Sequence, residues 1–92
     1  MKTIWKFAMP FDDVATVMIP QGATMLSVGV QDEMPMIWAV VDSEAPLTAR
    51  RFRVAGTGHR LDLESTVQFI GTIQLENGRF IFHIFEMLTN EP

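Results

Sequence analysis

The stretch TVQFIGTIQLENGRFIFHIFEM, residues 66–87, decides the fold. Two runs of alternating side chains flank the pair Asn77-Gly78, which is the preferred sequence for a two-residue type I′ turn between antiparallel strands. Counting outward from this turn sets the register of a predicted β-hairpin. The expected pairs are Glu76–Arg79, Leu75–Phe80, Gln74–Ile81, Ile73–Phe82, Thr72–His83, Gly71–Ile84 and Ile70–Phe85.

This register gives the hairpin two unequal faces. The face expected in the core holds Leu75, Ile73, Phe80, Phe82 and Ile84. The other face is mixed and holds Gln74, Thr72, Ile70, Ile81, His83 and Phe85. Gly71 has no side chain opposite Ile84, which indicates a bend or a close approach by another element.

Most of the remaining chain also alternates with period two, which predicts further strands. They are expected at residues 2–7, 14–19, 23–31, 36–42 and 50–55. In the third of these, Leu26, Val28 and Val30 are predicted to face inward. Residues 36–42 are apolar on both faces, which is typical of a central strand or of one that a partner subunit covers. Residues 43–47 could form one helical turn or a loop.

Six or seven short strands joined by turns predict an all-β fold, a small antiparallel sandwich or partly open barrel that ends in the Asn77-Gly78 hairpin. The length of 92 residues favours a single domain over residues 1–92. The chain has no cysteine and two histidines far apart in sequence, so we expect no metal site and no cofactor.

The charge balance and the hydropathy pattern restrict the partners and the location. Seven basic and eleven acidic side chains give a net charge of −4, which argues against binding a nucleic-acid backbone. Residues 1–13 do not form a signal peptide, and no apolar run is long enough to span a bilayer. We therefore expect a cytoplasmic protein with no membrane partner.

Residues 50–60 form the densest polar cluster of the chain. A glycine-flanked turn can direct backbone N–H groups at an anion, and nearby arginines can donate to phosphate or carboxylate. The candidate ligand-binding residues are Arg51, Arg53, Gly56, Thr57, Gly58, His59 and Arg60. The simpler interpretation, a strand-ending turn beside two solvated arginines, is favoured over a ligand site, because neither a phosphate-loop pattern nor a dinucleotide fingerprint is present.

His59 and His83 are the only side chains expected to act as a general base near neutral pH. No serine-centred or cysteine nucleophile motif occurs, and a lone histidine on a mixed β face is more often structural. We therefore assign no catalytic residue and expect that the protein is not an enzyme, with catalysis by His59 as the minor alternative.

The surplus of apolar residues on second faces of strands predicts a homo-oligomer that covers them. The candidate interface residues are Trp38, Ile70, His83 and Phe85.

Five segments together resemble a family of uncharacterised proteins of about ninety residues found in bacteria, prophages and phages. They are residues 2–7 (KTIWKF), 37–46 (IWAVVDSEAP), 56–59 (GTGH), 70–75 (IGTIQL) and 82–86 (FHIFE). The resemblance spans nearly the whole chain and implies a small protein often carried by mobile elements. It implies no activity and no functional residue, because the family's function is unknown.

These observations lead to two expectations about function. The first is a non-enzymatic binding protein, a phage or prophage accessory factor that blocks host defence or sequesters a small anionic, nucleotide-like signal. The second is a protein-interaction or assembly module that docks on a host or other protein through an apolar sheet face.

Overall fold

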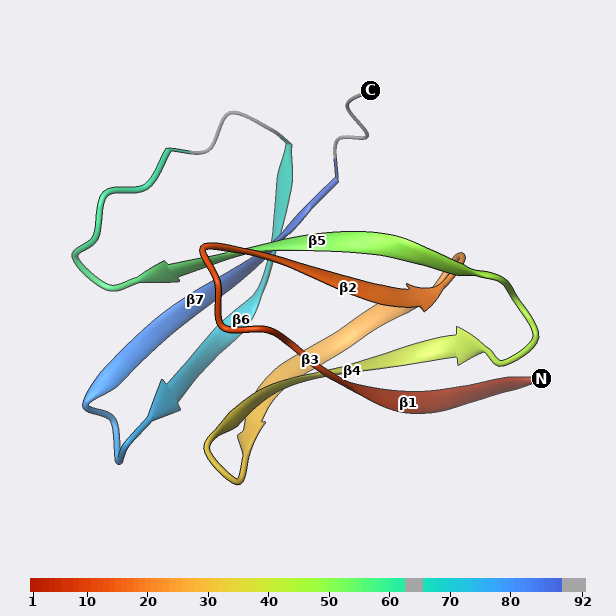
Figure 1. The fold of residues 1–92 in the computed structure, drawn as a ribbon, viewed down its shortest axis with the longest axis horizontal. Coiled ribbons are helices and arrows are strands. Elements are labelled where there is room, and N and C mark those ends of the chain that lie inside the picture. Colours follow the sequence, from red (N-terminus) through yellow and green to blue (C-terminus); the bar gives the residue numbers. More distant parts are fainter. Residues whose placement is uncertain (63–65, 89–92) are drawn as a thin grey trace.

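The structure is a computed structural model that describes residues 1–62 and 66–88, and these residues form seven strands (Figure 1). The strands are β1 (Lys2–Ala8), β2 (Val14–Pro20), β3 (Thr24–Gln31), β4 (Met34–Asp42), β5 (Leu47–Gly56), β6 (Val67–Leu75) and β7 (Phe80–Met87). Every pairing between them is antiparallel. Within the described ranges there is no helix that could cross a bilayer.

The strands form two sheets, with strand orders β1-β4-β3 and β2-β5-β7-β6. Strand β4 lies at the centre of the smaller sheet, as its apolar character on both faces predicted. Strand β3 also packs against β6, which joins the sheets along one side (Figure 1). The predicted all-β antiparallel fold is confirmed, as a compact pair of sheets and not a closed barrel.

The core lies between the inner faces of the two sheets. Alternation in β2, β4 and β5 places every second side chain there, which is the pattern of a half-buried strand. The largest buried side chain is Phe52, and the core also contains Ala15, Val17, Ile19, Ile37, Ala39, Val41, Val54, Ile73 and Ile84. Residues 43–46 form a turn without a helix, because β5 already begins at Leu47.

The register predicted for the β6–β7 hairpin holds from Leu75–Phe80 to Gly71–Ile84. Beyond Gly71 it is wrong, because β6 has a bulge between Phe69 and Gly71, so that Phe69 and not Ile70 lies opposite Phe85. Ile70 packs against the core as a result. At the other end of the hairpin, Phe80 is 43% exposed and not buried as predicted, because it lies beside the turn where the sheet ends.

A second bulge corrects the prediction for β3. The register between β3 and β4 shifts between Met25 and Ser27, so one extra residue, Leu26, stands in the strand. Leu26 therefore faces solvent with 48% of its surface exposed. Met25 packs against the core in the place that was expected for Leu26. The prediction that Val28 and Val30 face inward is confirmed.

Gly71 marks a close approach between β6 and β3. A Cβ atom built on Gly71 would lie 2.9 Å from Cγ2 of Val28. The absence of a side chain at this position therefore lets the two sheets meet along this side, which is the second of the two explanations expected for this glycine.

Candidate functional site

The glycine-histidine loop is a tight turn at the end of β5. The His59 N–H donates to the carbonyl oxygen of Gly56 at 3.1 Å, and Gly58 has φ +84°, a conformation that glycine adopts without strain. The His59 ring folds back over Gly56, because a Cβ atom there would lie 2.6 Å from Nδ1 of His59. Gly56, Thr57 and His59 thus come together, with Thr57 anchored by its N–H to the carbonyl oxygen of Ile81 at 3.1 Å.

The arginines predicted beside this loop point elsewhere. Arg53 is 17% exposed and donates to the carbonyl oxygens of Asp13 and Val54. Arg60 pairs with Asp62 at 3.1 Å on the surface. Arg51 lies on the outer face of the larger sheet, since its neighbour Phe52 points into the core. The expected strip of arginines is therefore not assembled around the glycine loop.

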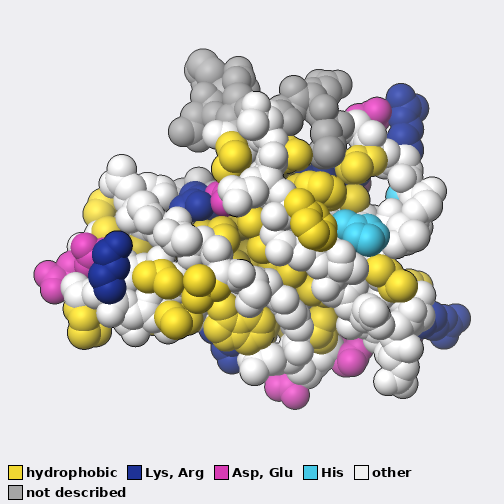
Figure 2. Space-filling view, turned by 180° about the vertical axis from the view of Figure 1, so that it is seen from behind, with side chains coloured by type: hydrophobic (Ala, Val, Ile, Leu, Met, Phe, Trp, Pro, Cys, Tyr) yellow, Lys and Arg dark blue, Asp and Glu magenta, His cyan; other side chains and the backbone are white. Residues whose placement is uncertain are grey.

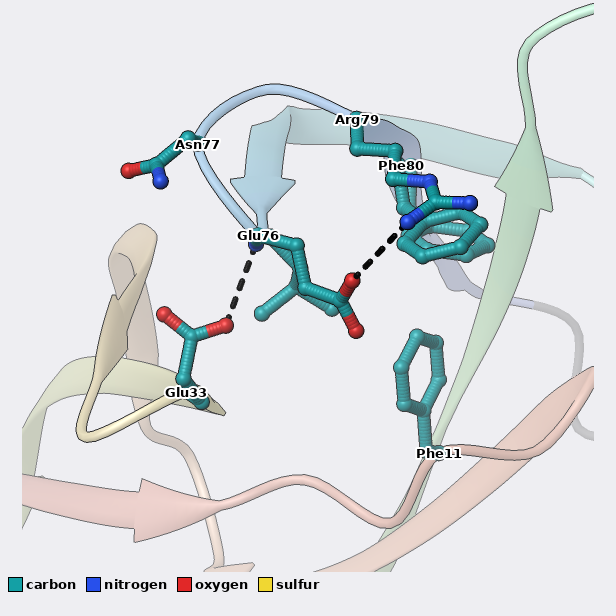
Figure 3. Close-up of a pocket in the computed structure, with 8 residues that line it drawn as sticks. Phe11, Glu33, Glu76, Asn77, Arg79 and Phe80 are labelled. Carbon is teal, nitrogen blue, oxygen red and sulfur yellow. Dashed lines mark hydrogen bonds and ion pairs between the residues drawn. The ribbon is translucent and has the colours of Figure 1, made fainter.

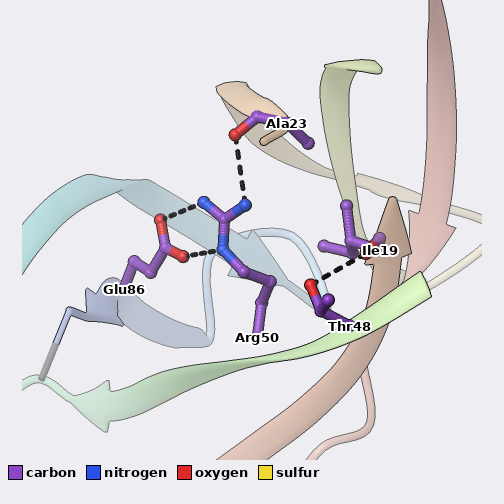
Figure 4. A network of polar contacts seen from close by, with 5 residues as sticks. All are labelled: Ile19, Ala23, Thr48, Arg50 and Glu86. Carbon is purple, nitrogen blue, oxygen red and sulfur yellow. Dashed lines mark hydrogen bonds and ion pairs between the residues drawn. The ribbon is translucent and has the colours of Figure 1, made fainter. Parts of the chain in front are cut away.

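A further arginine of the polar cluster, not among the candidate ligand-binding residues, makes contacts between the sheets (Figure 4). Arg50 of β5 makes a two-pronged ion pair with Glu86 of β7 through Nε–Oε2 and through Nη2–Oε1 at 3.0 Å, and it donates from Nη1 to the carbonyl oxygen of Ala23 at 3.1 Å. Glu86 is 4% exposed. The ion pair joins two strands of the larger sheet, and the contact with Ala23 connects Arg50 to the residue before β3, so both contacts are structural.

His83 lies on the outer face of β7 between two threonines. Its Nε2 shares a hydrogen bond with the Thr57 hydroxyl at 2.7 Å, and its Nδ1 shares one with the Thr72 hydroxyl at 3.0 Å. Both ring nitrogens are therefore occupied, and no carboxylate orients the ring among these contacts. The arrangement suits a histidine that ties the Thr57 loop to the sheet better than a general base.

Two adjoining hollows lie at the end of the molecule where the turns meet. The smaller has a volume of about 260 Å³ and includes Gly56, Thr57 and His59 in its lining. The larger has a volume of about 760 Å³ and is lined by Phe11, Glu33, Leu75, Glu76, Asn77, Arg79, Phe80 and Phe82 (Figure 3). Arg79, Phe80 and Phe82 line both, so the two hollows form one groove, which we call the turn groove.

The larger part of the turn groove has aromatic walls and two neighbouring glutamates. The rings of Phe11 and Phe82 meet edge to face with centroids 4.8 Å apart. The carboxylate of Glu33 accepts the N–H of Glu76 at 3.1 Å, and the Arg79 guanidinium lies 5.6 Å from the centre of the Phe80 ring.

Both glutamates stand where the backbone is left-handed. Glu33 has φ 62° in the β3–β4 turn, and Glu76 has φ 51° in the β6–β7 turn. Residues other than glycine, asparagine and aspartate rarely adopt this conformation, which costs about 1 to 2 kcal/mol per residue. Residues in such sparsely populated backbone conformations concentrate at functional sites. The two turns therefore make the groove that they line a candidate functional site.

Sequence reasoning did not group the residues of the larger hollow into one site, because they come from segments far apart in the chain. Glu33 and Glu76 carried one weak signal, which is a carboxylate in a short turn where glycine or asparagine is preferred. Within residues 1–62 and 66–88, no three histidine, aspartate or glutamate side chains come together as ligands for a metal ion.

The predicted interface residues do not share one face. Trp38 is on the outer face of the smaller sheet, where its ring covers Gly29: a Cβ atom on that glycine would lie 3.1 Å from the indole. Phe85 is on the outer face of the larger sheet and contacts Phe69 with ring centroids 5.4 Å apart. Figure 2 shows apolar side chains across the middle of one side of the molecule, with charged groups mostly at its rim.

Neither the curated proteins nor the solved structures contain a significant match to the chain. A family model described as a domain of unknown function, DUF7352, matches residues 1–92. The chain therefore belongs to the DUF7352 family, a family of unknown function.

Proposed function

We propose that the protein is a non-enzymatic binding module that docks on a partner protein through the outer face of its larger sheet. The observation that carries this proposal is a group of four neighbouring side chains on that face, which we call the docking patch. Its residues are Arg51, Phe69, Phe85 and Met87. Phe85 lies opposite Phe69, and Met87 lies opposite Arg51 in the next row of the sheet.

The docking patch has the composition of an interface core. Aromatic residues, methionine and arginine are enriched there relative to the rest of protein surfaces. Phe69 lies on an edge strand of the larger sheet and is 55% exposed. An exposed apolar side chain on an edge strand promotes association with another chain unless a partner covers it. Within the described residues, Arg51 has no ion-pair or hydrogen-bond partner, so its guanidinium is available to a carboxylate of the partner.

The charge on the patch favours a foreign partner over a second copy. A two-fold axis through the patch would bring two Arg51 guanidinium groups close together. The patch contains no carboxylate that would neutralise the repulsion between them. A protein surface that presents one carboxylate among apolar side chains would match Arg51 and cover Phe69. Blocking a host defence component would be one instance of such docking.

A photo-crosslinking amino acid at position 69 tests this proposal, with the same group at position 4 as the matched control. Ile4 is 57% exposed on the smaller sheet. We expect position 69 to give one defined heterologous adduct that position 4 does not give. The isolated partner should then bind Phe69→Ser and Arg51→Glu variants at least roughly tenfold more weakly than the parent, and Leu26→Ser unchanged. Adducts with the protein itself, supported by a dimer mass in light scattering, would instead establish the homo-oligomer.

A second candidate, binding of a small anionic ligand, has one observation in its favour. The smaller part of the turn groove brings His59, Thr57 and Arg79 together, and no carboxylate is among its lining residues. A phosphate group there could accept from the Arg79 guanidinium and the Thr57 hydroxyl. Mass spectrometry of the supernatant after heat extraction of the purified protein tests it: a stoichiometric nucleotide supports sequestration, and an empty supernatant together with no thermal shift by added nucleotides counts against it.

A further inference from the structure

The larger part of the turn groove combines two features that recognise cations. Its walls carry the rings of Phe11, Phe80 and Phe82, whose faces attract a positive charge. Two neighbouring glutamates, Glu33 and Glu76, also line it and come from different turns. The volume of about 760 Å³ is within the range of sites that hold small ligands or a long side chain.

The groove already holds one cation of the protein itself. The Arg79 guanidinium lies over the Phe80 ring and faces the Glu76 carboxylate, from which its Nη1 is 4.0 Å away (Figure 3). That distance is at the limit of an ion pair, and the Arg79 side chain is 75% exposed. The Arg79 guanidinium is therefore held only weakly at a position that suits a cation. Its side chain could move away without any change in the strands.

The surroundings of the groove increase its preference for positive charge. Asp12 follows Phe11 directly, and Asp32 precedes Glu33, and both aspartates are exposed. The two glutamates that line the groove outnumber its one arginine. A cleft with charges of one sign raises the local concentration of ligands with the opposite sign.

We propose that the turn groove binds a guanidinium or ammonium group carried on an aliphatic stem, as in an arginine or lysine side chain of a peptide, and that this group replaces Arg79 over Phe80. The stem would lie along the phenylalanine rings, while Glu33 and Glu76 would accept hydrogen bonds from the charged head. Because Oε1 of Glu33 already accepts the Glu76 N–H, the other carboxylate oxygen, Oε2, is the one that would accept from the charged head. The site does not include the docking patch, so the two proposals stand or fall separately.

The role of Arg79 separates this proposal from anion binding in the same groove. If Arg79 competes with the ligand, its removal strengthens binding of a cation. If Arg79 is a receptor for phosphate, its removal abolishes binding of an anion. The Arg79→Ala variant therefore gives opposite results under the two hypotheses.

The test is titration calorimetry with an acetyl-glycyl-arginyl-glycine amide peptide and with the same peptide carrying citrulline, which has nearly the same shape without the charge. We expect the arginine peptide to bind roughly tenfold or more tightly than the citrulline peptide, and Arg79→Ala to raise its affinity about three- to tenfold. Glu33→Gln and Glu76→Gln should each weaken it about fivefold or more. Glu44→Gln, which makes the same change in net charge beside the N-terminus, should leave it unchanged.

Each contrary result overturns the proposal in a recognisable way. Equal affinity for the citrulline peptide, weaker binding by Arg79→Ala, or an equal loss in Glu44→Gln would show that the groove is no cation site. Agmatine serves as the free cation: affinity equal to that of the arginine peptide identifies a small molecule as the source, and weaker affinity identifies a protein side chain. Amide chemical shifts of residues 33 and 76 report occupancy of the groove, and thermal melts of each variant show that it is folded.

Discussion

Replacement of Arg50 by methionine is expected to destabilise the protein more than any other single change of a charged side chain described above. The change leaves the Glu86 carboxylate, 4% exposed, without its guanidinium partner. Breaking a buried ion pair from one side costs about 3 to 5 kcal/mol. A chain of this length has a free energy of unfolding of about 5 to 14 kcal/mol, so the loss is a large share of the total.

The converse change should cost less. Glu86→Leu leaves Arg50 without its carboxylate, but the Arg50 side chain is 23% exposed and keeps the carbonyl oxygen of Ala23 as an acceptor. We expect about 2 kcal/mol for this variant. The double variant removes both charges and fills the space with apolar groups of similar volume, so it should lie within about 1 kcal/mol of the parent.

Urea unfolding of the four proteins completes the double-mutant cycle. At an m-value of about 1 kcal/mol/M, the Arg50→Met midpoint should fall by about 3 to 5 M, and the double variant should recover most of that loss. Singles that each cost under about 1 kcal/mol, or a double variant as unstable as the sum of the singles, would refute the reasoning. The first result would mean that the pair is not shielded from water, and the second that Arg50 and Glu86 do not depend on each other.

Two further predictions concern the junction of the sheets and the N-terminus. Gly71→Ala should destabilise the protein by about 1 to 3 kcal/mol, because the new methyl group would meet Val28, and Val28→Ala in the same chain should restore part of the loss in thermal melts. The pKa of Asp42 lies below its ordinary value of 3.8 because its carboxylate accepts the Glu44 N–H and pairs with the N-terminal ammonium group. Because the pKa is lower in the folded state, the Asp42 carboxylate stabilises the fold at pH values above the ordinary pKa and loses that contribution as the pH falls through the lowered pKa. Asp42→Asn should therefore be less stable than the parent at about pH 6 but lose less stability on transfer to about pH 2.5. Equal losses of stability in urea unfolding would contradict this prediction.

The strands were predictable because apolar and polar residues alternate along the sequence of a half-buried strand. The apolar side chains of residues 36–42 and the Asn77-Gly78 pair indicated a central strand and a hairpin, and both follow from local rules of alternation and turn chemistry. The two bulges could not be predicted in this way. One extra residue, Leu26 in β3 and Ile70 in β6, reverses the facing of its neighbours, and its position depends on the partner strand.

The site was less predictable than the fold, for a different physical reason. Arg53 looked like a solvated arginine from its place in the alternation, but its acceptors are carbonyl oxygens that include one forty residues away. Arg50 belonged to the polar cluster of residues 50–60, but its pairing with Glu86 could not be predicted, since a buried ion pair is visible only when the register between β5 and β7 is known. Of the predicted ligand-binding residues, Gly56, Thr57 and His59 line one hollow because they are neighbours in a single turn.

The charged residues of this chain fall into groups with different energetic roles. Arg50 and Glu86 satisfy each other between the sheets, and every described buried side-chain nitrogen or oxygen has a hydrogen-bond partner, so this group contributes to folding. Glu33 and Glu76 lie in turns whose left-handed backbone opposes them, and their exposed contacts return little stability. Two neighbouring carboxylates held at such a cost beside aromatic rings are better explained by what the groove binds than by the stability of the fold, which is why the turn groove is the first place to seek a ligand.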